Sequence, residues 1–135
     1  VLFDPKDARK YRELAARANY LAQDRADIQY AVQEICRGMC IPCKGDQRRL
    51  RRLARYLISE PRVVIEYSWQ AIQSTLMGFS DSDFAGCRRT ARSTSGGVLM
   101  VGSHYIRSWS VTQKTVALSS GEAELTAASR PAAKS

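Results

Sequence analysis

The spacing of the apolar residues changes near Arg62, and this change constrains the fold more than any other feature of the chain. Before Arg62, apolar residues recur three and four positions apart, which is the spacing of amphipathic α-helices. After it, short β-branched runs are separated by Gly and Ser, which is typical of strands joined by turns. The sequence therefore predicts an α+β protein with a helical region at 4–60 and a sheet region at 61–135.

Three helices are expected in the helical region. The first covers residues 4–22, with Asp4 as its cap and a proline at its first position. A second helix is expected to start near Asp27, which can also act as a cap, and to end before Pro42. A third begins at Gly45. Each carries one apolar stripe, so the three helices are expected to pack against one another.

In the sheet region, short apolar runs predict an antiparallel meander that leads into a helix. The helix is expected to begin at Ser119 or Ser120 and to stop at Pro131 after about three turns, because proline cannot continue the hydrogen-bond ladder. Ala123, Ala127 and Ala128 are small enough to pack closely on the sheet. The runs expected as strands are 63–67, 75–79, 97–101, 105–109 and 114–118.

The chain is strongly basic, with 21 Lys and Arg against 13 Asp and Glu and a formal charge of +8. A surplus of this sign and size favours a polyanionic partner such as nucleic acid. Arginines on one helix face contact phosphates by charge and not by base sequence, although a solvated face is the alternative. The predicted nucleic-acid contacts are Arg48, Arg49, Arg51, Arg52 and Arg55 on the third helix, and Arg88, Arg89 and Arg92 in the sheet region.

The cysteines leave three interpretations open. Cys40 and Cys43 have the two-residue gap of a zinc knuckle or of a redox pair, and Cys36 lies one helical turn earlier. A zinc site would need Cys87 or the single histidine, His104, to complete its ligands. A redox pair would be expected to follow a strand, which this motif does not. Ordinary free thiols are the third interpretation.

Four carboxylates stand apart, because they are the only acidic side chains after Glu66. Asp81 and Asp83 lie two apart on an expected strand, so both can face one site. Glu122 and Glu124 lie two apart on an expected helix and point in nearly opposite directions. The two pairs can simply mark a strand end and a helix start. If they serve one site, only one of the two glutamates can reach it.

Glu122 has a structural role available, since the run from Ser119 to Glu122 fits a capping box. Glu124 is therefore the chemical candidate beside Asp81. Clustered carboxylates suit Mg²⁺, which prefers oxygen ligands, and two such ions about 4 Å apart can promote phosphodiester hydrolysis. A Ser-His-Asp hydrolase is a poor alternative, because His104 is the single histidine and no Gly-x-Ser-x-Gly motif is present.

Four motifs resemble, in order and spacing, the ribonuclease H region of copia-type LTR retrotransposon polyproteins. They are Phe-Ser-Asp-Ser-Asp-Phe-Ala-Gly at 79–86, Arg-Ser-Thr-Ser-Gly-Gly at 92–97, Ser-Trp-Ser at 108–110 and Thr-Val-Ala-Leu-Ser-Ser-Gly-Glu-Ala-Glu at 115–124. The preceding helical region is similar to the stretch that joins the reverse transcriptase to that domain. The resemblance covers roughly residues 8–128.

This resemblance implies a partial RNase H-like fold. In it, a three-stranded antiparallel meander forms part of a mixed sheet and is followed by a helix. It implies Mg²⁺-dependent cleavage of the RNA strand of RNA/DNA hybrids, with the rest of the Pol polyprotein as a further partner. Asp81 and Glu124 match two of the family's metal-binding carboxylates, and Asp83 is a possible additional one. The family's remaining acids follow this helix, so we expect the 135-residue chain alone to cleave hybrids poorly or not at all.

A second reading stays open, in which the chain is a non-catalytic basic module that binds nucleic acid or a protein assembly. The N-terminal residues have neither a basic leader nor a long apolar segment with a cleavage site, so a cytoplasmic or nuclear and not a secreted protein is expected. No apolar run approaches the ~20 residues needed to cross a bilayer, so no membrane partner is expected.

Overall fold

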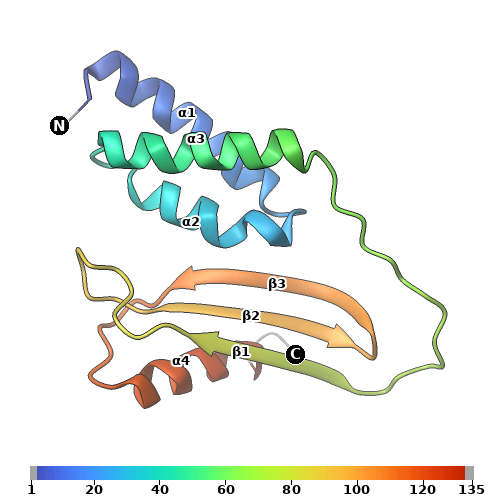
Figure 1. Ribbon diagram of the computed structural model, residues 1–135. Coiled ribbons are helices and arrows are strands. Elements are labelled where there is room, and N and C mark those ends of the chain that lie inside the picture. Colours follow the sequence, from blue (N-terminus) through green and yellow to red (C-terminus); the bar gives the residue numbers. More distant parts are fainter. Residues whose placement is uncertain (1–2, 133–135) are drawn as a thin grey trace. The chain divides into compact units, whose positions relative to one another are not determined.

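The structure is a computed structural model that describes residues 3–132, and in it helices come first and strands follow (Figure 1). This order is that of the predicted α+β class. The chain divides into two compact units, of which the first ends at Val64 and the second begins at Ile65. We call them the helical unit and the sheet unit. No helix among the described residues is both long enough and apolar enough to span a lipid bilayer.

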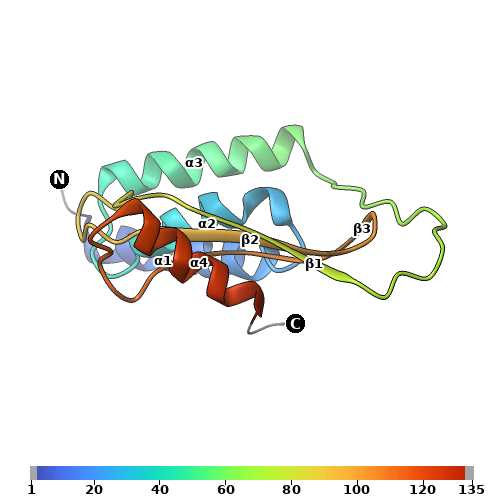
Figure 2. The ribbon, with the colours of Figure 1, turned by 90° about the horizontal axis from the view of Figure 1, so that it is seen from below.

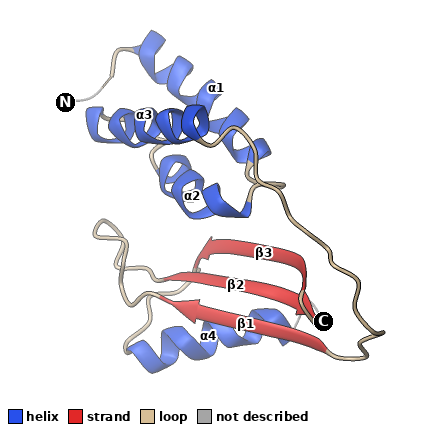
Figure 3. Ribbon diagram, turned by 45° about the vertical axis from the view of Figure 1, so that its right-hand side comes forward, coloured by secondary structure: helices blue, strands red, loops and turns tan. Residues whose placement is uncertain are grey.

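The helical unit contains α1 (Pro5–Leu21), the short 3₁₀ helix η1 (Ala26–Ile28), α2 (Gln29–Arg37) and α3 (Lys44–Ser59) (Figure 3). These bounds agree with the three helices expected from the apolar spacing. Asp4 stands at the N-cap of α1 as predicted, although its side chain makes no capping hydrogen bond. The proline that follows it fixes the first helical backbone angle.

One capping prediction in this unit is wrong. Asp27 lies inside η1, and its carboxylate accepts hydrogen bonds from Arg25 (2.7 Å) and from the hydroxyl of Tyr56 (2.9 Å) instead of capping α2. The N-cap of α3 is Cys43, whose backbone N–H donates to the carboxylate of Asp46 (3.1 Å). The Cys43 thiol also donates to that carboxylate (3.1 Å), so α3 starts on a thiol–carboxylate pair.

The core of the helical unit is apolar and joins all of its helices. One buried hydroxyl enters this core, and Tyr11 satisfies it by donating to the backbone carbonyl of Ile35 at 2.6 Å. The pair ties α1 to the last turn of α2. The buried core residues are Tyr11, Ala15, Ala18, Ala22, Ile28, Val32, Ile35 and Leu53.

The described residues of the sheet unit form an antiparallel sheet of β1 (Leu76–Ser82), β2 (Thr94–Val101) and β3 (His104–Thr112), in the order β1-β2-β3. The tight turn between β2 and β3 contains Gly102 at φ 59°, a backbone angle that glycine adopts without steric cost. Helix α4 (Ser120–Ala132) packs against β1 and β2 and covers one face of the sheet (Figures 1 and 2).

Two of the five predicted strands are wrong. Residues 63–67 and 114–118 are not strands, although both runs are rich in β-branched side chains. The first segment contacts β3 through a side chain and not through a backbone ladder. The Tyr67 hydroxyl donates to the backbone carbonyl of Tyr105 (2.8 Å). A β-branched run forms a strand only where a neighbouring backbone is available to pair with it.

Helix α4 lies on the sheet through Ala123 and Ala127, which are both buried as expected, whereas Ala128 is exposed. The predicted stop at Pro131 is wrong, since this proline lies within α4. Between sheet and helix, Gln113 donates to the carbonyl of Ala123 (2.8 Å) and to a serine hydroxyl of β2. The interior of this unit is therefore partly polar.

Candidate functional site

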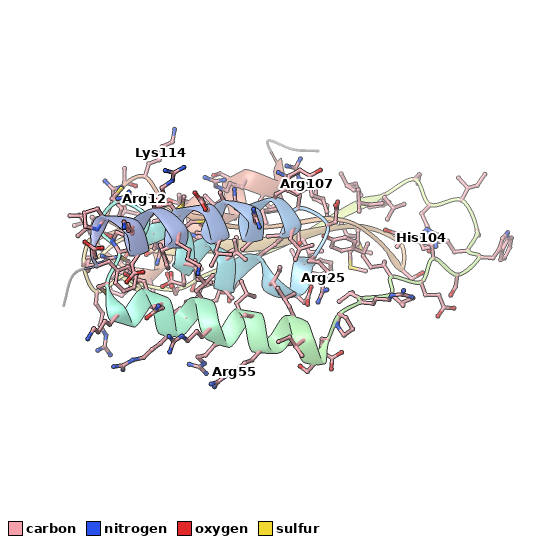
Figure 4. All side chains as sticks on the ribbon, turned by 90° about the horizontal axis from the view of Figure 1, so that it is seen from above. Arg12, Arg25, Arg55, His104, Arg107 and Lys114 are labelled. Carbon is pink, nitrogen blue, oxygen red and sulfur yellow. The ribbon has the colours of Figure 1, made fainter. Side chains whose placement is uncertain are left out.

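The outer face of α3 carries most of the predicted nucleic-acid contacts. Arg48, Arg51, Arg52 and Arg55 are exposed, and none of them forms an ion pair within residues 3–132. Figure 4 shows Arg55 pointing outward from α3. The opposite side of the helix buries Leu53 in the core, which fixes the rotation of α3 and keeps these arginines in solvent. We call these four residues the arginine face.

Arg49 differs from the arginine face. Its guanidinium donates to the carboxylate of Asp46 at 2.8 Å, and that carboxylate is buried. Burial alone would raise the pKa of Asp46, but the hydrogen bonds from Cys43 and the charge of Arg49 outweigh it and hold this pKa below its usual value. Arg49 therefore neutralises a buried charge, a role that the sequence analysis did not predict.

The other predicted basic contacts lie in the loop between β1 and β2. Arg88, Arg89 and Arg92 are all exposed there. Three backbone hydrogen bonds of Cys87 close the loop. Its carbonyl accepts from the N–H groups of Thr90 (3.1 Å) and Ala91 (2.7 Å), and its N–H donates to the carbonyl of Arg92 (3.2 Å). The three exposed arginines therefore lie within one hydrogen-bonded turn at residues 88–92.

Asp81 and Glu124 are both exposed, on β1 and α4 respectively. An added Cβ at Gly78 would lie 2.7 Å from the Cβ of Pro131, so Gly78 faces α4. Because side chains alternate along a strand, Asp81 lies on the face of β1 turned away from that helix. Its cross-strand partner Gly96 likewise faces open space.

Asp83 is engaged by the backbone of β2. Its N–H donates to the carbonyl of Thr94 (3.1 Å), and its carboxylate accepts the N–H of the same residue. Next to this pair, the hydroxyl of Ser93 accepts the N–H of Ala85 (3.1 Å). Asp83 therefore closes the loop that carries Arg88, Arg89 and Arg92, and one of its carboxylate oxygens has a structural role there.

Glu122 is confirmed as a helix cap. The hydroxyl of Ser119 accepts the N–H of Glu122 (3.2 Å), as the capping box requires. The carboxylate of Glu122 accepts the N–H of Leu118 (2.7 Å), one residue before the cap. The different roles assigned to the two glutamates thus have a structural basis, and Glu124 is exposed on α4.

Within residues 3–132, no three His, Cys, Asp or Glu side chains come together as a metal site. The described residues therefore do not fit a complete magnesium site, and the roles of Asp81 and Glu124 stay predictions. The described cysteines and His104 likewise do not come together as the ligands of a zinc site. All four cysteines are free thiols; burial raises the pKa of Cys36, and Cys40 is exposed.

A groove between α2 and α3 was not predicted from the sequence. Its volume is about 560 Å³, and its wall includes the exposed rings of Tyr30 and Tyr56 together with Arg52. We call it the tyrosine groove. The available signal was that both tyrosines lie off the apolar stripes of their helices, although spacing alone does not show that two such rings line one groove.

Comparison with known proteins identifies relatives over most of the chain. An uncharacterized mitochondrial protein of Arabidopsis thaliana is 36% identical over 132 residues, covering 97% of this chain and 53% of that protein. The retrovirus-related Pol polyprotein from transposon RE1 of the same plant is 36% identical over 118 residues, covering 87% of this chain and 8% of the polyprotein. The secreted RxLR effector protein 161 of Plasmopara viticola is 36% identical over 105 residues, or 78% of this chain and 73% of that protein.

No family model and no solved structure matches the chain. The chain spans about half of the mitochondrial relative and a small part of the polyprotein. The aligned stretches include both the helical and the sheet unit, since each covers more than three quarters of the chain. On this sequence identity, the chain belongs to the family of copia-type retrotransposon Pol polyproteins.

Proposed function

We propose that this chain is a nucleic-acid-binding segment of a Pol polyprotein, made of the stretch that precedes the ribonuclease H domain and the first part of that RNase H-like domain. Its ligand in this proposal is the RNA/DNA hybrid formed during reverse transcription. The observation that carries the proposal is the arginine face of α3, four exposed guanidinium groups with no ion pair in residues 3–132. Such a face binds phosphates without reading base sequence.

The hydrolytic role of the family enters this proposal only in part. Asp81 and Glu124 are exposed, but Asp81 lies on the face of β1 turned away from α4, so their roles as Mg²⁺ ligands stay predictions for a complete domain. The carboxylate of Asp83 accepts a hydrogen bond from the backbone N–H of Thr94. Two carboxylates recruit a cation weakly, and in-line attack on a phosphodiester needs the complete ligand set. Binding, and not cleavage, is therefore the function proposed for these 135 residues alone.

A cleavage assay separates this proposal from an active nuclease. The chain and its Asp81→Asn variant are incubated with an RNA/DNA hybrid and Mg²⁺, and the RNA strand is analysed for cuts. We expect no cleavage above background with either protein. Cleavage by the chain that disappears in Asp81→Asn would overturn the proposal in favour of a working nuclease.

The salt dependence of binding tests the arginine face. In the variant with Arg48, Arg51 and Arg55 replaced by Gln, the slope of log affinity against log salt should fall by roughly 2–3, since each phosphate contact contributes about 0.9. The charge-matched control removes three exposed cations of α1, Lys6, Lys10 and Arg17, and should leave most of the slope in place. An equal slope in the chain and the α3 variant contradicts the proposal.

A further inference from the structure

The tyrosine groove has the size and the walls of a site for one nucleotide. Its volume of about 560 Å³ lies within the roughly 300–1,000 Å³ of small-molecule sites. Tyr30 exposes 57% and Tyr56 40% of its surface, so both rings are available to a flat ligand. Ile28 and Leu53 form the buried apolar floor between them.

The charges around the tyrosine groove favour an anion. Both acids of its wall are already neutralised, Asp27 by Arg25 at 2.7 Å and Glu34 by Arg37. Hydrogen bonds from Arg25, then from the hydroxyl of Tyr56, lower the pKa of Asp27 and keep it ionised and paired. Arg52 lines the same groove and forms no ion pair within residues 3–132.

The two tyrosines are held differently. The hydroxyl of Tyr56 donates to Asp27 at 2.9 Å, which fixes the Tyr56 ring as a wall of the tyrosine groove. Tyr30 is the more exposed ring, on the α2 side. A second groove, between α1 and α3, has a volume of only about 250 Å³, and its tyrosine, Tyr11, is buried and bonded to Ile35. Its other aromatic ring, Phe3, is partly buried and packs edge-on against Tyr11.

We propose that the tyrosine groove binds one unpaired nucleobase of a single-stranded nucleic acid, stacked on Tyr30 against the Tyr56 wall, with Arg52 at the adjoining phosphate. Aromatic rings beside cationic side chains bind bases without sequence preference, because every base has a π-face. This inference rests on the proposed function of α3. It adds that the helical unit binds an unpaired strand by its bases as well as by its phosphates.

Abasic oligonucleotides provide the test, because they keep the phosphates and lack the bases. The full chain is titrated, at one salt concentration, with a fluorescent ten-nucleotide single strand and with an abasic strand of the same length. We expect the abasic strand to bind about tenfold more weakly, the usual size of one base–aromatic stack. Tyr30→Ala should weaken binding of the normal strand about tenfold and leave the abasic strand unchanged.

Two further variants sharpen this test. Tyr20→Ala removes an even more exposed tyrosine from α1 and should change neither affinity, with circular dichroism checking that each variant keeps its helices. Tyr56→Phe keeps the ring and loses the bond to Asp27, so its effect should be smaller than that of Tyr30→Ala.

Three results overturn the inference in distinguishable ways. Equal affinity of the chain for normal and abasic strands removes the base contact, and so does an unchanged affinity in Tyr30→Ala. If the α3 arginine variant still lowers the salt slope in those cases, the proposed function stands alone. If neither single strand binds, the inference fails, and the proposed function fails with it only if the RNA/DNA hybrid does not bind either.

Discussion

The helical unit and the sheet unit differ in the balance of apolar and polar side chains that they bury. The helical unit has one continuous apolar core, in which Leu53 of α3 meets residues of α1 and α2. The sheet unit buries polar groups between its layers, among them Ser95 and Gln113, while Leu118 and Leu125 are exposed. Apolar burial stabilises in proportion to its area, whereas a buried hydrogen bond adds little beyond what water offered. We therefore expect the helical unit to be the more stable of the two.

The same contrast holds for charge. The helical unit concentrates exposed cations on α3, where the one acid of the helix itself, Asp46, is buried and already paired with Arg49. The sheet unit carries the exposed carboxylates Asp81 and Glu124. The arginine face and the two predicted catalytic carboxylates thus lie on different units, so each can be perturbed separately.

The largest expected effect is that of Leu53→Ala in the helical core. Removing this buried side chain should lower the free energy of unfolding of the helical unit by about 2–5 kcal/mol. Denaturant unfolding followed by circular dichroism, with amide exchange to separate the units, measures this. Leu125→Ala, at a leucine 74% exposed, should change stability by no more than about 0.5 kcal/mol. Equal effects of the two variants would contradict the comparison.

The next effect concerns pH. Burial raises the pKa of Tyr11 to about 12, from 10.0, and the charge of Asp46 adds to it. Because the folded state prefers the neutral phenol, Tyr11 stabilises the fold fully below pH 10. Between pH 10 and about 12 the free energy of unfolding should fall by roughly 2–3 kcal/mol as the phenol ionises.

The check is the pH profile of unfolding of the chain and of Tyr11→Phe. The variant cannot ionise here, so its profile should fall less steeply in that window. Tyr20→Phe, at an exposed tyrosine, should follow the unmodified chain. Parallel profiles for the chain and Tyr11→Phe would show that the buried phenol does not matter.

A smaller effect is expected between the layers of the sheet unit. An added Cβ at Gly97 would overlap the ring of Trp109 and lie 2.8 Å from the carbonyl of Phe79. Gly97→Ala should therefore destabilise the sheet unit by about 1–3 kcal/mol. The adjacent Gly96→Ala meets nothing within 4 Å and should be nearly neutral. Thermal unfolding of the two variants makes the comparison, and similar midpoints would show that Trp109 moves freely.

The smallest effect tests whether Glu122, and not Glu124, stabilises the start of α4. Glu122→Ala removes the acceptor of the Leu118 N–H and should cost α4 about 1 kcal/mol. Glu124→Ala, at an exposed carboxylate, should change stability by less than about 0.5 kcal/mol. A larger loss for Glu124→Ala, measured by the same thermal unfolding, would mean that Glu124 has a structural role.

Much of the fold followed from local pattern. The helices of the first unit and the cap of α4 were predictable, because a 3.6-residue apolar repeat and a Ser-x-x-Glu box act over a few neighbouring residues. The strands at 63–67 and 114–118 were wrong because strand formation depends on a partner backbone that a local pattern does not reveal.

The candidate site followed the same division. The exposure of Arg48 and Arg55 follows from their positions opposite the apolar stripe of α3. The pairing of Arg49 with Asp46 depends on the burial of that carboxylate, and the engagement of Asp83 depends on the register of β2. The tyrosine groove requires two helices to be placed side by side, which sequence spacing does not specify.

The most direct measurement is an amide NMR titration of the chain with a short RNA/DNA hybrid at low salt. We expect the perturbed amides to cluster in α3, with a smaller set in the turn at residues 88–92. We expect the amides of α4 to stay unchanged. Perturbations confined to β1 and α4, with α3 unaffected, would contradict the claim that the arginine face binds the hybrid.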